Sequence, residues 1–194
     1  QAGKTLREEL KRAARQIRQP VDRNADIGSA FDAITYLKGG AVLGMFESWL
    51  GEEGFRAGIR THMERFPHSV ADVEDFMASL AKGSGRPDVI PAFRSFIDQP
   101  GVPLVTAKLA CDADGAALVV SQSRYLPVGS RGNPQSTWQL PVCVRHGTGD
   151  TTGKDCALVT TPEARIPLQT TGCPAWAMPN ANGAGYYRFA LDAV

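Results

Sequence analysis

The feature that most constrains the fold of this chain is a change of sequence pattern at residues 99–103. Before this point apolar side chains recur every three or four residues, which is the spacing of amphipathic helices. After it, short runs of alternating apolar and polar residues are separated by turn residues, which is typical of antiparallel strands. We therefore predict an α+β chain, with an N-terminal α-helical domain at residues 1–99 and a small antiparallel β-sandwich domain at residues 100–194.

The helical part is predicted to contain five helices that end at prolines, glycines or polar clusters. They cover residues 5–19, 34–50, 52–66, 69–81 and 88–97. The second is apolar on most sides, so we expect it to be buried from several directions. Thr35 is a plausible N-cap for this helix, and Gly51 is its expected C-terminal stop.

The second part is predicted to contain strands at residues 104–111, 116–124, 137–145, 155–160 and 186–191. Its cysteines form no CxxC pair, which argues against a structural zinc site. Residues 146–154 have the composition of a hairpin turn, which would place Cys143 opposite Cys156 within disulfide distance. That pairing would leave Cys111 to bond with Cys173, and four buried thiols are an equal alternative.

Composition excludes several kinds of partner. Lys plus Arg number 21 and Asp plus Glu number 20, so the surface lacks the strong charge of a nucleic-acid or anionic-membrane binder. No run of eighteen apolar residues is present, so we expect no membrane span. With 43% hydrophobic residues, the chain can bury a substantial core.

The sequence lacks the HExxH and GxSxG catalytic motifs, and one residue is left as a candidate for a catalytic role. The three histidines include no HExxH pair of zinc ligands, and there is no GxSxG nucleophile motif. Tyr36 stands at the start of the most hydrophobic predicted helix. There a tyrosine hydroxyl can donate a hydrogen bond to an oxyanion, which the positive end of the helix also favours. A tyrosine packed into the core is the alternative.

Several blocks, taken in order, resemble the M1 family of zinc aminopeptidases. The first is Tyr36-Leu37-Lys38-Gly39, and the second is the run LGEEGFRAG at residues 50–58, which matches a "GEExFRxG" pattern. Residues 71–80 match a following "A…DF…AL" helix. Residues 96–105 look like the family's exit from its catalytic domain into a β-sandwich, and residues 179–188 look like the closing strand of that sandwich.

This resemblance implies that the chain is an internal fragment of a zinc-dependent aminopeptidase, which hydrolyses N-terminal residues from peptides. By motif position Tyr36 is the tyrosine that stabilises the tetrahedral intermediate, and Phe31 lines the pocket for the substrate's N-terminal side chain. In the family two histidines and a glutamate hold the zinc that activates water. Those ligands, the loop that grips the substrate's amino terminus and a C-terminal helical domain would lie outside this chain, among the remaining aminopeptidase domains.

The chain alone is therefore expected to bind no zinc and to be inactive. A non-catalytic scaffold or interaction module derived from the same family is the alternative function. Cysteine usage and family habit favour a bacterial periplasmic or secreted parent.

Overall fold

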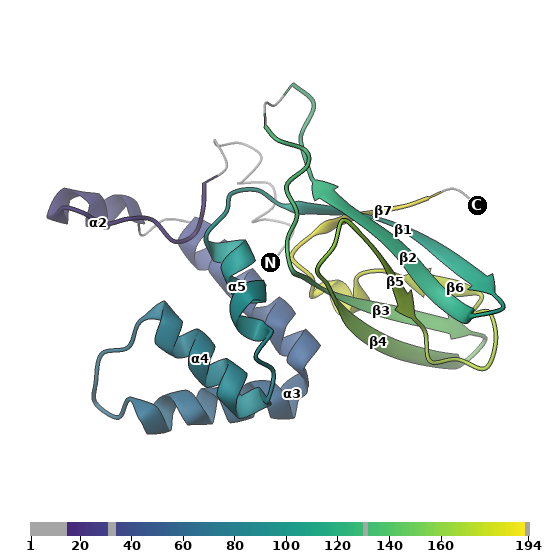
Figure 1. Cartoon of the computed structure of the whole chain (residues 1–194), viewed down its shortest axis with the longest axis horizontal. Helices are drawn as coiled ribbons and strands as arrows, with labels where there is room; N and C mark the ends of the chain where they lie inside the picture. The colour runs from purple at the N-terminus through teal and green to yellow at the C-terminus, as the bar shows by residue number, and fades with distance from the viewer. Residues whose placement is uncertain (1–14, 31–33, 130–131, 193–194) are drawn as a thin grey trace.

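The computed structural model describes residues 15–30, 34–129 and 132–192, with helices in the first part of the chain and strands in the second (Figure 1). The helical elements are α2 (Asn24–Ala30), η1 (Ile34–Lys38), α3 (Gly39–Arg65), α4 (Val73–Ser84) and α5 (Val89–Ile97). Within the described ranges, no helix combines the length and the apolar character needed to cross a bilayer. The helices of the first part and the strands of the second confirm the predicted α+β class.

The predicted break at Gly51 is a kink within one long element. Gly51 has a φ of 76° and a ψ of 161°, so α3 consists of two helical segments joined at this residue. Such a left-handed φ suits glycine because it has no Cβ. The carboxylates of Glu52 and Glu53 lie at the start of the second segment and pair with Arg56 one turn on, as ordinary surface charges do.

Three predictions about the helical part need correction. Thr35 is no N-cap, because it lies inside the π-helical turn η1, where its hydroxyl accepts a hydrogen bond from Arg15. The first predicted helix lies mostly outside the described residues, and its described end at residues 15–19 is not helical. The fourth begins at Val73 instead of residue 69, since Asp72 and Asp75 form a reciprocal capping box there.

Two sheets make up the second part, one in the order β5-β2-β1-β7 and the other in the order β4-β3-β6. The strands are β1 (Pro103–Asp112), β2 (Gly115–Arg124), β3 (Leu140–Thr148), β4 (Thr151–Val159), β5 (Glu163–Pro167), β6 (Trp176–Met178) and β7 (Arg188–Leu191). Pairing is antiparallel except between β1 and β7, which are parallel. The short strands β5 and β6 were not among the predicted strands.

Two disulfides link the strands and loops of the sandwich, and one of them follows from the strand register. Cys143 lies directly opposite Cys156 in the β3–β4 hairpin, and the two are bonded. Cys111, near the end of β1, is bonded to Cys173 in the segment before β6. These are the pairings expected from the hairpin, and the structure contains no free cysteine.

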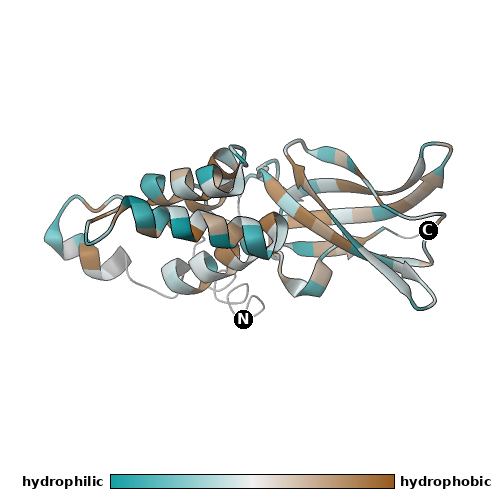
Figure 2. Cartoon of the chain, turned by 90° about the horizontal axis from the view of Figure 1, so that it is seen from below, coloured by the Kyte–Doolittle hydropathy of each residue, from teal (hydrophilic) through white to brown (hydrophobic). Residues whose placement is uncertain are grey.

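One hydrophobic core runs through the helices and both sheets. Phe46 of α3 contacts Phe93 and Phe96 of α5, and Phe96 contacts Trp138 just before β3. Figure 2 shows the helical part and the sheets end to end, with apolar and polar residues alternating along the ribbons. The boundary at residues 99 and 100 falls in the connection from α5 to β1, and the independence of the two domains stays a prediction.

Candidate functional site

Tyr36 lies in η1 and borders an open hollow of about 340 Å³. Its residue surface is 65% exposed, so its ring is not packed into the core as the alternative interpretation required. The rest of the lining consists of small or apolar residues from two distant parts of the chain: Leu37, Gly40, Ala41, Gly44, Gly183 and Ala184. Among the described residues, the lining beside Tyr36 carries no charged side chain.

The α3 wall of the hollow is open because it carries glycines. Gly40 and Gly44 are four residues apart, which places them on the same face of α3. A Cβ added at either position would meet no atom within 4 Å. The missing side chains therefore leave space beside the tyrosine ring.

The opposite wall comes from a turn in the sandwich, η2 (Ala181–Gly183). Asn182 and Gly183 both have positive φ, of 56° and 65°. The Asn180 side chain fixes the turn, because it accepts a hydrogen bond from the Gly185 N–H at 2.8 Å and donates one to the Gly185 carbonyl at 3.1 Å. The resemblance placed the closing strand at residues 179–188, but the strand begins only at Arg188, close to the strand predicted from the residue pattern at residues 186–191.

Lys38 anchors the other side of η1 and is fully buried. Its ammonium donates a hydrogen bond to the Gly101 carbonyl at 3.2 Å and lies 5.8 Å from the centre of the Tyr186 ring. A buried ammonium is costly unless it is bonded in this way. Lys38 thus ties the turn that carries Tyr36 to the connection between the helices and the sheets, a role that the sequence analysis missed.

The Tyr36 side chain is exposed, and within the described residues η1 runs directly into α3. Tyr187 provides a contrast within the same chain: it is buried, its hydroxyl donates to the Pro179 carbonyl, and burial raises its pKa.

The position of the other predicted substrate-binding residue relative to Tyr36 stays a prediction. Phe31 lies outside the described residues. No group of three or more His, Cys, Asp or Glu suited to a metal ion occurs in residues 15–30, 34–129 and 132–192. His62 contacts the Ser79 hydroxyl between α3 and α4, and His146 is buried in the sandwich. The described residues therefore do not fit the zinc site of the family that the sequence resembles.

Comparison with known proteins agrees with the helical part of this description. The model of the peptidase family M1 domain matches residues 1–98. Aminopeptidase M1 of Arabidopsis thaliana is 34% identical over 184 residues, which cover 89% of this chain and 20% of that protein. Puromycin-sensitive aminopeptidase of Caenorhabditis elegans is 26% identical over 177 residues, covering 91% of this chain and 19% of that protein.

Aminopeptidase N of Lactococcus lactis is 35% identical over 118 residues, which cover 60% of this chain and 13% of that protein. The chain therefore spans about a fifth or less of the length of these relatives. Two of the three matches extend well beyond residue 98, so the similarity includes the sandwich as well as the helices.

Proposed function

This chain belongs to peptidase family M1, and from that premise we propose that it forms part of an aminopeptidase that hydrolyses N-terminal residues from peptides. In this proposal Tyr36 is a catalytic residue. Its hydroxyl donates a hydrogen bond to the peptide carbonyl oxygen as that oxygen becomes negatively charged. The zinc chemistry of such an enzyme would come from residues outside the described part of this chain.

The observation that supports this role is the open position of the Tyr36 ring on the hollow beside α3. A hydrogen-bond donor to an oxyanion has to face a space that a substrate can enter. It also has to be held in place before the reaction, since reorganisation would cost part of the gain. Two observations support the proposal: the Lys38 hydrogen bond to Gly101 fixes η1, and the Tyr36 ring stays accessible.

The hollow itself is proposed to hold the part of the peptide next to the reacting carbonyl. Its glycine-lined and apolar walls suit an uncharged stretch of substrate. Phe31 is proposed to form an apolar wall for the substrate's N-terminal side chain. Lys38 is a positioning residue in this proposal, since it acts on the substrate only through the η1 backbone.

The test is the kcat of Tyr36→Phe in a full-length enzyme that contains this segment. Removal of one oxyanion donor is expected to lower kcat by about a hundred- to a thousandfold. Tyr187→Phe is the matched control, because it removes a buried tyrosine hydroxyl that donates to the Pro179 carbonyl and does not line the Tyr36 hollow. A loss below about threefold for Tyr36→Phe, or equal losses in both variants, contradicts the proposal.

A further inference from the structure

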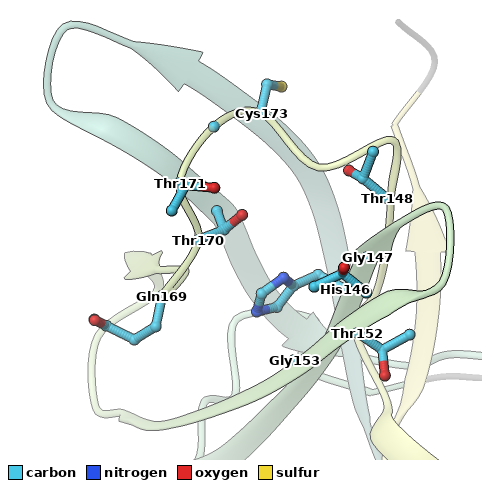
Figure 3. A pocket seen from close by; sticks show the side chains of 11 residues that line it. His146, Gly147, Thr148, Thr152, Gly153, Gln169, Thr170, Thr171 and Cys173 are labelled. Carbon is cyan, nitrogen blue, oxygen red and sulfur yellow. The ribbon is translucent and has the colours of Figure 1, made fainter.

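A second concave site lies in the sandwich and shares no residue with the Tyr36 hollow. It measures about 490 Å³ and opens between the β3–β4 hairpin and the segment that precedes β6. Figure 3 shows the ring of His146 inside this pocket, with Thr170 and Thr171 on the wall across from it. Nothing in the proposed peptidase function uses this site.

His146 is built into the sheet in an unusual way for a polar side chain. It is only 3% exposed, and its ring lies over its cross-strand partner Gly153. A Cβ on Gly153 would come within 2.7 Å of the ring, so glycine is required to make room for it. The imidazole is therefore held rigidly at the floor of the pocket.

One ring nitrogen is satisfied and the other is not. Nε2 lies 2.8 Å from Oδ2 of Asp155, and the same oxygen accepts a hydrogen bond from the Gln169 N–H at 2.8 Å. A carboxylate partner assigns the proton of a neutral imidazole to Nε2, which leaves Nδ1 as an acceptor. No hydrogen bond to Nδ1 occurs among the described residues, although the side chain is more than nine-tenths buried.

The rest of the lining is neutral and rich in hydroxyl groups. No Asp, Glu, Lys or Arg of the described residues lines it. Four threonine hydroxyls form no hydrogen bond with any described residue: those of Thr151, Thr152, Thr170 and Thr171. Each hydroxyl can donate one hydrogen bond and accept others. This chemistry suits an uncharged ligand that itself carries several hydroxyls, and offers nothing to pair with an ion.

The pocket wall is fixed before any ligand arrives. The disulfide from Cys111 to Cys173 holds the end of residues 169–173 against β1. The Gln169 N–H holds the start of the same segment on Asp155. At the hairpin tip the Thr148 hydroxyl accepts a hydrogen bond from the Ala175 N–H. A preformed pocket of this kind lowers the entropic cost of binding.

We propose that this pocket binds a saccharide unit, with one sugar hydroxyl donating to Nδ1 of His146 and others contacting the threonine hydroxyls. A single pyranose ring is neutral, compact and hydroxylated on all sides, and it can both donate and accept hydrogen bonds. The pocket binds either a free monosaccharide or a residue of a longer glycan, since both present the same hydroxyl chemistry.

The test is nuclear magnetic resonance of the chain labelled with ¹⁵N-histidine. The three histidines give three sets of ring nitrogens, and His62 and His68 act as internal controls. D-glucose, D-galactose, D-mannose and N-acetyl-D-glucosamine are titrated separately. At least one is expected to shift the Nδ1 signal of His146 saturably, with a Kd on the order of 1 mM, and to leave the other histidines unchanged. If none of the four sugars does so, the proposal is overturned.

Matched variants place the binding in the pocket. Thr171→Val removes an exposed hydroxyl without loss of volume and is expected to weaken binding about three- to tenfold. Thr160→Val removes a hydroxyl outside the pocket and is expected to change nothing. Equal effects of the two variants overturn the proposal. A trisaccharide of the sugar that binds distinguishes the two possible ligands. If the trisaccharide binds more tightly than the monosaccharide, the ligand is a residue of a longer glycan; if the two bind equally, the ligand is a free sugar.

Discussion

Gly58, the last residue of the LGEEGFRAG block, is expected to be required by the packing of α3 against α4. A Cβ at this position would lie 2.7 Å from Cδ2 and 2.9 Å from Cα of Leu80. The side-chain atom could move, but the Cα belongs to the backbone of α4. Overpacking of this kind costs about 1 to 3 kcal/mol. Replacement of a helical glycine by alanine returns about 0.5 to 1 kcal/mol.

Taken at their midpoints, these two effects give a net loss of about 1 kcal/mol in the free energy of unfolding for Gly58→Ala. Gly54→Ala is the matched control, because it lies one turn earlier in α3 and its Cβ would meet no atom closer than 3.7 Å. That variant should be stabilised by about 0.5 to 1 kcal/mol. Urea unfolding followed by tryptophan fluorescence gives both values, and equal stability of the two variants would refute the packing argument.

Three further outcomes are expected. Hydrogen bonds from Arg94 and Arg18 hold the pKa of Glu74 below its ordinary value of 4.5, so its contribution to stability is present above pH 4.5 and is lost as the pH falls below it. In urea unfolding, Glu74→Gln should therefore lose less stability on acidification than the wild type does. Identical pH profiles of the two proteins would contradict this. The double variant Cys143→Ser with Cys156→Ser should lose about 3 kcal/mol, given the 13-residue separation, and an unchanged urea midpoint would argue against that estimate. Gly44→Leu should fill the hollow beside Tyr36 without reducing chain stability, and should raise KM in the full-length enzyme; an unchanged KM would remove the hollow from substrate binding.

Features set by local sequence could be predicted. The change from helices to strands follows from residue periodicity, and the break at Gly51 follows from the freedom of glycine at positive φ. The bond between Cys143 and Cys156 depends on a single hairpin register, which a turn of suitable composition specifies. These features need no knowledge of distant contacts.

Features set by tertiary contacts could not. The burial of Lys38 depends on Gly101, which comes from another part of the chain. The Tyr36 hollow needs the turn at Gly183, whose nearness to η1 leaves no trace in local periodicity. Strand β6 is only three residues long, too short to show an alternating pattern, and its sheet recruits it by pairing with β3.

The central claim is that the Tyr36 hydroxyl interacts with the transition state more strongly than with the bound substrate. It is tested most directly by the Kd of two inhibitors for the full-length enzyme with and without Tyr36→Phe. One inhibitor is a phosphinic peptide that carries a tetrahedral, negatively charged centre, and the other is a substrate-like peptide that resists hydrolysis. The variant is expected to bind the phosphinic peptide about a hundredfold more weakly and to bind the substrate-like peptide unchanged. Equal changes in both affinities, or no change in either, would contradict it.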